Sequence, residues 1–155
     1  MARKRKYIYK IDEIPFTPLV EDQGIVAQLF LSDNMQISFL QNPPGADFPE
    51  HSHAAEQVLI MLEGSEEHIL DGEIIHMEAG DICFHPSNMP HGGKTITGFK
   101  GIDIFFPQRT EKGGHVDRMR QYGTMPDDQG NYPKNTVQTP LAPWFMALLD
   151  SLKKK

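Results

Sequence analysis

The sequence has few of the features that mark secreted or membrane-bound proteins. Its 155 residues include one cysteine, Cys83, which excludes a disulfide within the chain and fits a reducing compartment. The N-terminal region has no long apolar run, since the basic residues 3–6 are followed at once by the mixed stretch 7–12. A signal peptide or a membrane anchor needs such a run. We therefore expect a cytoplasmic protein with no membrane partner.

Positive charge is also scarce. The 15 Lys and Arg residues are outnumbered by 21 Asp and Glu residues, which gives a net charge of −6. Nucleic-acid-binding domains usually have the opposite balance, so we expect no nucleic acid partner. The hydrophobic share of 39% is that of a globular protein, and 155 residues are enough for one domain with its own core.

Turn-forming residues are frequent, and 13 Gly and 12 Pro divide the sequence into short segments. The Asp71-Gly72 pair between two alternating segments is a strong hairpin signal. Strands at this spacing predict an all-β fold, a small antiparallel β-barrel or jelly roll. The expected strands lie at 25–31, 35–40, 57–62, 66–70, 73–77, 82–85 and 96–106.

The C-terminal part of the sequence has a different character. Residues 111–140 are polar and loop-like, whereas 143–152 have the apolar stripe of one amphipathic α-helix with Pro143 in its first turn. We expect this helix to pack on the outside of the barrel or on a second subunit, and a lid over the barrel mouth is the alternative. The expected divisions are an N-terminal segment 1–20, a barrel 21–110, and a loop with a helix 111–155.

Three histidines and one glutamine have the chemistry and spacing of metal ligands. His51 and His53 are two residues apart, so on an extended strand both side chains leave the same face, whereas a helix would separate them. Gln57 has the same parity, and His91 follows Pro90 much later. Three imidazoles and an amide oxygen suit one divalent transition metal, Zn, Ni, Fe, Mn or Co, better than Ca or Mg. We predict a site for one such ion on these four residues.

The same residues resemble the first motif of the cupin superfamily. That motif runs Gly, five residues, His-x-His, three or four residues, Glu, six residues, Gly. Here its positions are occupied, at matching intervals, by Gly45, His51, His53, Gln57 and Gly64. The resemblance implies a jelly-roll barrel built around a metal ion, and a homodimer.

The second cupin motif runs Gly, five residues, Pro-x-Gly, two residues, His, three residues, Asn. The segment from Gly80 to Thr95 matches it, with His91 at the histidine position. Asn88 replaces the middle Gly, and Asn is among the residues that best tolerate a positive φ angle. Thr95 replaces the final Asn.

Gln57 is a departure from the family, since most cupins have a metal-binding Glu at this position. Glu56 is the rival ligand, but adjacent residues of a strand point to opposite faces, and the interval to Gly64 selects Gln57. A neutral amide would leave the ion with its full charge, which favours Lewis acid chemistry. The alternative is that Gln57 is an ordinary polar residue of the barrel lining, hydrogen-bonded to His53.

A third cluster follows in the last predicted strand. Asp103 and Phe105 share one strand face, and Arg109 comes just after Pro107. This ending resembles that of small cupins that linearise unsaturated monouronates from pectin and alginate. The resemblance implies that Asp103 is an acid or base, that Phe105 packs on the substrate ring, and that Arg109 holds the substrate carboxylate. The alternatives are a surface residue, a core residue and a solvated turn residue, respectively.

The remaining histidines have no ligand-like spacing. We predict that His68, His76 and His115 are surface residues. His85 shares its strand parity with Cys83 and opposes Ile82 and Phe84, so it points outward if that apolar pair fills the core.

Three functions fit the sequence. The first is a metal-dependent enzyme without redox change, of isomerase or lyase type, that acts on a small carboxylated and possibly sugar-derived substrate. The second is a cupin dioxygenase. The third is a metal or small-molecule binding protein without catalysis. Asp103 and Arg109 favour the first, because a proton-transfer group and a carboxylate clamp together exceed what binding requires.

Overall fold

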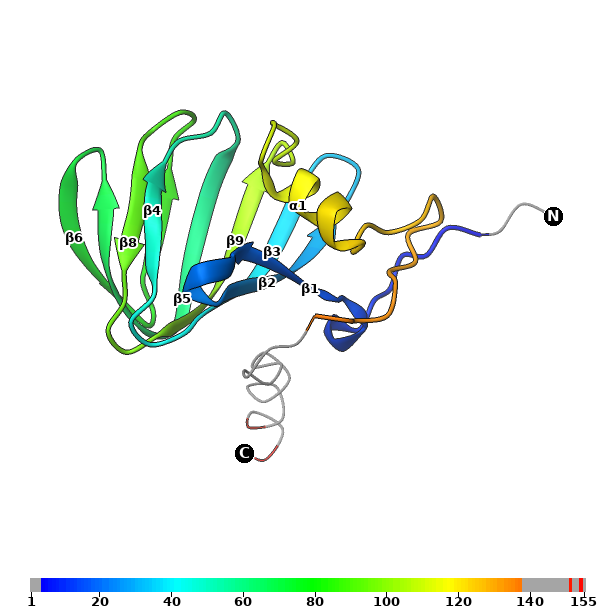
Figure 1. Ribbon diagram of the computed structural model, residues 1–155, viewed down its shortest axis with the longest axis horizontal. Helices are drawn as coiled ribbons and strands as arrows, with labels where there is room; N and C mark the ends of the chain where they lie inside the picture. Colours follow the sequence, from blue (N-terminus) through cyan, green and yellow to red (C-terminus); the bar gives the residue numbers. More distant parts are fainter. Residues whose placement is uncertain (1–3, 138–150, 152–153, 155) are drawn as a thin grey trace.

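The computed structural model describes residues 4–137, 151 and 154 of the chain, and this part is mainly β-structure. Its strands pair antiparallel into a strongly curved sheet that forms an open barrel (Figure 1). The strand order is β1-β2-β3-β9-β5-β8-β4, and β6 and β7 also pair with β5. The strands are β1 (Phe16–Val20), β2 (Ile25–Leu31), β3 (Gln36–Asn42), β4 (Asp47–His51), β5 (Glu56–Leu70), β6 (Glu73–Glu78), β7 (Ile82–His85), β8 (His91–Lys94) and β9 (Phe99–Phe106). The predicted all-β barrel fold is confirmed.

Strand β5 is the central strand of the barrel, because β6, β7, β8 and β9 all pair with it. The sequence predicts two strands here, 57–62 and 66–70, but they form one. Gly64 interrupts the pattern with a φ of 84° without ending the strand, and the pairing with β9 shifts register between Met61 and Glu63. A Cβ on Gly64 would lie 2.0 Å from the carbonyl oxygen of Gly98, so this crossing requires glycine.

Three strands were not predicted: β1, β4 and β8. Each contains the residues that normally indicate turns, namely Pro18 in β1, Pro49 in β4, and Gly92 with Gly93 in β8. β1 and β4 are the first and last strands in the order of the sheet. A proline is tolerated in such an edge strand because one side of the strand has no neighbour that needs its backbone N–H. The glycines of β8 allow close approach, since a Cβ on Gly92 would lie 2.8 Å from the carbonyl oxygen of Phe48 in β4.

The segment predicted to be a loop, 111–140, contains a helix. Helix α1 (His115–Tyr122) ends at Gly123, which adopts the left-handed conformation common after helices. The helix contacts β1, and Figure 1 shows it beside that strand. Its buried residues are His115, Val116 and Met119. Eight residues are too few for a clear helical period, which explains the wrong prediction. Two short 3-10 helices, Ile11–Glu13 and Glu21–Gln23, precede β1 and β2.

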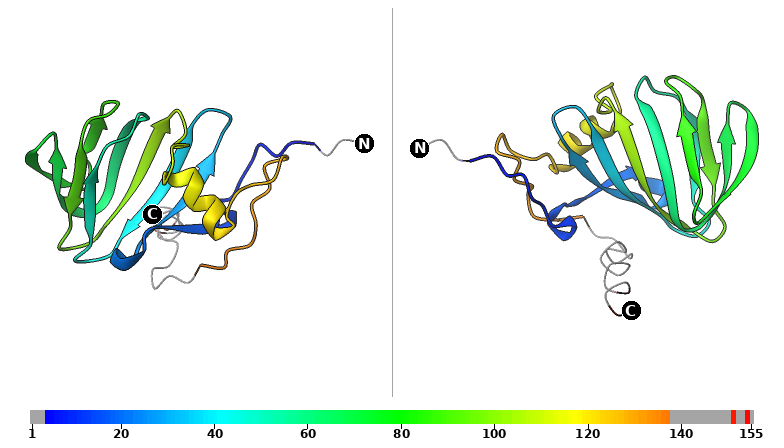
Figure 2. Two further views of the ribbon diagram at one scale, coloured as in Figure 1. Left: turned by 45° about the horizontal axis from the view of Figure 1, so that its top comes forward. Right: turned by 180° about the vertical axis from the view of Figure 1, so that it is seen from behind.

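The N-terminal stretch of the chain packs against the segment that follows α1. The N-terminal stretch runs beside the segment after α1 in both views of Figure 2, and Lys6 donates its backbone N–H to the carbonyl of Gln129. The amphipathic helix predicted over 143–152 lies outside the described residues, apart from Ser151. Among the described residues, no helix combines the length and apolarity needed to cross a membrane.

The interior of the barrel has two chemically different ends. One is an apolar core that includes Ile25, Leu29, Leu59 and Met61. The other holds an unusual number of buried polar side chains: His53, Gln57, Glu66, His68, His85, His91, Asp103, Arg109 and His115. Burying so many polar groups costs folding free energy, which marks this end of the barrel as the place to look for function.

Candidate metal centre and pocket

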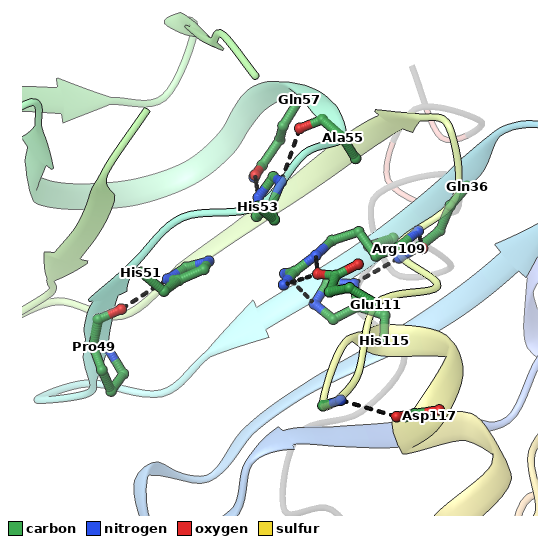
Figure 3. Close-up of polar contacts among 12 residues, drawn as sticks. Gln36, Pro49, His51, His53, Ala55, Gln57, Arg109, Glu111, His115 and Asp117 are labelled. Carbon is green, nitrogen blue, oxygen red and sulfur yellow. Dashed lines mark hydrogen bonds and ion pairs between the residues drawn. The ribbon is translucent and has the colours of Figure 1, made fainter. Parts of the chain in front are cut away.

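The three histidines among the four predicted metal ligands converge at the polar end of the barrel. His51 is the last residue of β4 and His91 the first of β8, and these residues are paired across the two strands. The ring centroids of His51 and His91 are 4.4 Å apart, and those of His53 and His91 are 4.8 Å apart. One ring nitrogen from each of the three lies within 4.8 Å of the others. Figure 3 shows His53 beside Gln57, and His51 beside Pro49.

One detail of the sequence prediction is wrong. His51 and His53 do not share a strand, because β4 ends at His51 and His53 lies in the loop before β5. His53 is held there because its backbone carbonyl accepts a hydrogen bond of 2.8 Å from the backbone N–H of Asn88, the φ-positive residue of the second motif. The two motifs therefore meet through the backbone as well as through the histidines.

Each of the three histidines has its ring orientation fixed by a backbone carbonyl. The Nδ1 atoms of His51, His53 and His91 lie 2.8 Å from the carbonyl oxygens of Pro49, Ala55 and Met89, respectively. A carbonyl oxygen can only accept, so each Nδ1 carries the proton and each Nε2 presents its lone pair. Outer hydrogen bonds of this kind fix the tautomer of metal-binding histidines.

Gln57 completes this group from β5. It is buried, whereas Glu56 is exposed. The Gln57 Nε2 donates to Asp103 Oδ1 at 2.7 Å, which turns Oε1 toward His53 Nε2 at 3.0 Å. With His53 protonated on Nδ1, this pair consists of two lone pairs that face each other. A cation between them would remove the repulsion.

The polar atoms at this site thus fit a metal ion. The Nε2 of His91 is buried and has no hydrogen-bond partner within the described residues. Burial also lowers the pKa of His51 to about 4 and that of His91 to about 3, and it lowers the pKa of His53 as well. All three rings are therefore neutral at pH 7, which is the form that binds metals. This histidine-rich site could hold one divalent transition metal.

The residues predicted to be catalytic line the same pocket as the metal site. The pocket wall includes His51, Gln57 and His91 together with Asp103, Phe105 and Arg109. The side chains of Asp103 and Phe105 point inward from β9, and Arg109 follows that strand and is also buried. None of the three is a surface residue, so the solvated alternatives considered for Asp103 and Arg109 do not hold.

Asp103 is a buried carboxyl group. Burial raises its pKa to about 7, and the hydrogen bond from Gln57 opposes this shift. A carboxyl group with such a pKa can either give or take a proton near neutral pH.

Arg109 is held by groups that sequence analysis did not identify. Its Nε and Nη2 atoms lie 2.8 Å and 2.6 Å from Glu111 Oε1, and its Nη1 lies 3.3 Å from His115 Nε2 (Figure 3). Its guanidinium carbon lies 5.8 Å from the ring centroid of Phe105. The side chain is thus positioned before any ligand binds.

The predictions for the other histidines were partly wrong. His68 and His115 are buried, contrary to the prediction, while His76 is exposed as predicted. His85 points inward, because Ile82 and Phe84 lie on the outer surface. The inward-facing residues of β5 are Gln57, Leu59 and Met61 before the bulge. After it they are Glu66 and His68, so the alternation before the bulge does not predict that His68 faces inward.

Comparisons with known proteins agree with this geometry. Residues 39–102 match a family model described as a cupin domain. An RmlC-like cupin from Shewanella frigidimarina is 25% identical, with a TM-score of 0.62 over 69% of this chain and 96% of that one. KdgF from Halomonas sp. is 21% identical, with a TM-score of 0.61 over 68% of this chain and 96% of that one, a likeness of fold.

Among curated proteins, dimethylsulfoniopropionate lyase DddQ from Ruegeria pomeroyi is 34% identical over 67 residues. These residues are 43% of this chain and 33% of the lyase, so the chain spans about a third of that relative's length. The family match covers both histidine motifs and most of the curved sheet. Residues 39–102 of the barrel are therefore a cupin domain, and the fold as a whole is similar to that of an RmlC-like cupin.

Proposed function

We propose that this cupin is a metal-dependent enzyme, without net redox change, that isomerises or cleaves a small carboxylated substrate. The observation that carries the proposal is the meeting, in one pocket, of the histidine site with a buried carboxyl group, Asp103, and a buried guanidinium group, Arg109. A protein that only binds a carboxylate needs the guanidinium group of Arg109 but gains nothing from a buried carboxyl group of raised pKa.

The metal would be held by His51, His53, His91 and the amide oxygen of Gln57. When bound, it would supply Lewis acid polarisation of a substrate carbonyl or hydroxyl oxygen. Gln57 favours this chemistry because an amide ligand adds no negative charge. Its own orientation depends on Asp103, which accepts the hydrogen bond from Nε2.

Asp103 is the proton-transfer group in this proposal. Its carboxyl group lies in the pocket wall and its pKa of about 7 suits either protonation state. The acid and the base roles both remain open, because the direction of transfer depends on the substrate.

Arg109 is the anchor for the substrate carboxylate. Glu111 already occupies two of its N–H groups, whereas Nη1 is directed toward His115 and the pocket. We propose that a substrate carboxylate binds on this inner side, and that Glu111 keeps the guanidinium plane fixed. Phe105, buried below Arg109, would pack on the apolar face of the substrate.

Two substrate classes follow from likeness to known proteins. The sequence of the Asp103, Phe105 and Arg109 region resembles uronate-linearising cupins, which favours unsaturated monouronates and a role in carbohydrate metabolism. The name of the lyase DddQ identifies a second carboxylate, dimethylsulfoniopropionate. Both have the carboxylate that Arg109 would bind.

The test combines metal analysis with a ligand screen. We expect the purified protein to contain a divalent transition metal, and unsaturated monouronates or dimethylsulfoniopropionate to raise its melting temperature and be turned over. Iron together with oxygen consumption would instead favour a dioxygenase. Stabilisation without turnover of any carboxylate would leave a binding protein.

Substitution of Arg109 tests the anchor. Arg109→Ala should raise KM for carboxylated substrates by about 10-fold to 100-fold, since a charge-assisted hydrogen bond contributes about 1.5–3 kcal/mol. Arg109→Lys should recover only part of this loss, because an ammonium group cannot make the two-pronged contact. Steady-state kinetics with Arg120→Ala, an exposed arginine of α1, provides the control. Equal KM values for Arg109→Ala and wild type would refute the anchor role.

Gln57 can be tested with its neighbour as the matched control. Gln57→Glu should keep or tighten metal binding but lower turnover. The added charge weakens the Lewis acid, and a carboxylate 2.7 Å from Asp103 would raise the pKa of Asp103 further. Glu56→Gln, on the exposed side of β5, should change neither property. Loss of metal in Glu56→Gln would show that the ligand has been assigned to the wrong residue.

We also propose that the chain forms a homodimer through the outer surface of its sheet. Six apolar side chains lie together there, and we call them the outer apolar face: Val58, Ile60, Ile82, Phe84, Ile102 and Ile104. They are neighbours by strand pairing, with Val58 between Phe84 and Ile104, and Ile60 between Ile82 and Ile102. Ile82 is 68% exposed and Phe84 51% exposed. Apolar patches of this kind commonly mark protein interfaces.

Phe84→Glu should convert this dimer into a monomer, because the charge would be buried without a partner at the interface. Size-exclusion chromatography with light scattering measures the mass. Ile96→Glu is the matched control, since Ile96 is 87% exposed but lies outside the outer apolar face. A wild-type chain that is already monomeric at micromolar concentration would contradict the proposal.

A further inference from the structure

A second group of metal-binding side chains lies deeper in the barrel. His68 of β5 and Cys83 and His85 of β7 each direct one ligand atom into a space where all three atoms lie within 4.8 Å of one another. His68 Nε2 lies 2.7 Å from His85 Nε2, and Cys83 Sγ lies 3.7 Å from His85 Nε2. Both histidines are buried and Cys83 is half-buried.

A buried carboxylate orients this group. Glu66 Oε2 lies 2.9 Å from His68 Nδ1, and Glu66 is only 4% exposed. The carboxylate accepts the Nδ1 proton. Against the opposing effect of burial, the hydrogen bonds of Cys83 and Glu66 raise the pKa of His68 to about 9, so an ion binds His68 Nε2 by displacing the proton from that atom. A carboxylate that accepts from the outer nitrogen of a histidine is a common support for a metal ligand.

Hydrogen bonds within the protein do not satisfy His85. Only one proton can lie between the two Nε2 atoms. Whichever ring carries it, the Nδ1 of His85 is left buried without a partner among the described residues. The atoms that an ion between the residues would bind are the two Nε2 atoms and Cys83 Sγ, which lie close together with only one proton between the two rings.

We propose that His68, Cys83 and His85 form a second metal site, separate from the His51, His53 and His91 site and supported by Glu66. Two imidazoles and one thiolate suit Zn²⁺, and Co²⁺ can replace it. Binding releases two protons to solvent, the one between the two Nε2 atoms and the thiol proton of Cys83, and the resulting thiolate offsets part of the ion's charge.

The second site adjoins the first. The rings of His85 and His91 have centroids 4.4 Å apart, and both Glu66 and His68 line the pocket that contains His91 and Asp103. An ion therefore has a path from the pocket to the second site. With three protein ligands, this ion keeps a coordination position for water or substrate.

Cobalt spectroscopy tests the proposal without reference to activity. The full-length chain is freed of metal under reducing conditions and titrated with Co²⁺. Two equivalents should bind, and one of them should produce the near-ultraviolet charge-transfer absorption of a cobalt–thiolate bond. Because Cys83 is the single cysteine of the sequence, this absorption can come from no other residue. Added Zn²⁺ should abolish it.

Variants separate the two sites. Cys83→Ser should lose the absorption and one equivalent, while His51→Ala with His91→Ala should keep the absorption and lose the other equivalent. Glu66→Gln should weaken cobalt binding at the second site by about 10-fold to 100-fold. His76→Asn, an exposed histidine on β6, is the matched control for His68→Asn and His85→Asn.

A second readout covers variants that fold poorly. Zn²⁺ should slow the reaction of Cys83 with a disulfide reagent in the wild type and in His51→Ala, but not in His85→Asn. Binding of a single equivalent with no thiolate absorption would overturn the second site. So would an absorption that persists in both His68→Asn and His85→Asn, because the thiolate would then bind metal without the two imidazoles.

Discussion

Replacing His91 by alanine is expected to remove most of the metal bound at the His51, His53 and His91 site. His91 offers a buried Nε2 with no hydrogen-bond partner in the described part of the chain, and its Nδ1 is fixed by the carbonyl of Met89. Loss of an outer hydrogen bond at a metal site weakens binding by about 10-fold to 100-fold, and loss of a direct ligand should exceed this. Elemental analysis of the Cys83→Ser background isolates this site from the proposed second one.

The folded protein should tolerate this substitution when metal is absent. His91→Ala removes a buried ring nitrogen that has no partner, so its cost is mainly the cavity left by the ring, about 2–4 kcal/mol. Chemical denaturation of the metal-free proteins measures this cost. A normal metal content in the double variant His51→Ala, His53→Ala would show that these residues are not the ligands.

The sequence predicted that His51, His53 and His91 lie together, because local spacing specifies these residues. His51, His53 and Gln57 lie within seven residues, and His91 belongs to a motif of turn residues. Strand parity allows only one of Glu56 and Gln57 to face inward, and the motif interval to Gly64 selected Gln57. The structure buries Gln57 and exposes Glu56.

Ligand-like spacing does not find residues beyond an irregular stretch of backbone. His68 was predicted to be a surface residue because it lacks such spacing, but the bulge of β5 near Gly64 shifts the inward positions and His68 is buried. Pro49 and the glycines of β8 resembled loop residues, although both segments pair in the sheet that carries His51 and His91. Bulges and proline-containing edge strands are selected by tertiary packing, which a single sequence does not reveal.

The groups around Arg109 illustrate a third limit. His115 was predicted to lie on the surface, and Glu111 was not identified at all. Their contacts with Arg109 depend on how α1 packs toward β1, and no spacing within 111–122 specifies that packing. The outer apolar face is different, since Ile82 and Phe84 could have been assigned outward from the strand pattern once His85 was placed in the pocket.

Asp103→Asn is expected to lower turnover strongly while stabilising the metal-free protein. Burial raises the pKa of Asp103 to about 7, so the folded protein binds a proton between pH 4 and pH 7 that the unfolded chain releases. The unfolding free energy therefore falls as pH rises through this range, by up to about 1.4 kcal/mol per unit. A neutral amide avoids this cost, and its oxygen can still accept the hydrogen bond from Gln57.

The two effects must be measured together. If Asp103 transfers a proton, kcat on an unsaturated monouronate should fall about 100-fold or more with little change in KM. The metal-free variant should be more stable than wild type at pH 8 and should lose the difference toward pH 4. Improved stability with lost activity is typical when the replaced group is retained for function. Replacing a residue that is retained for structure would lower both the stability and the activity. An unchanged kcat in Asp103→Asn would show that Asp103 does not transfer a proton, and would leave carboxylate binding as the function of the pocket.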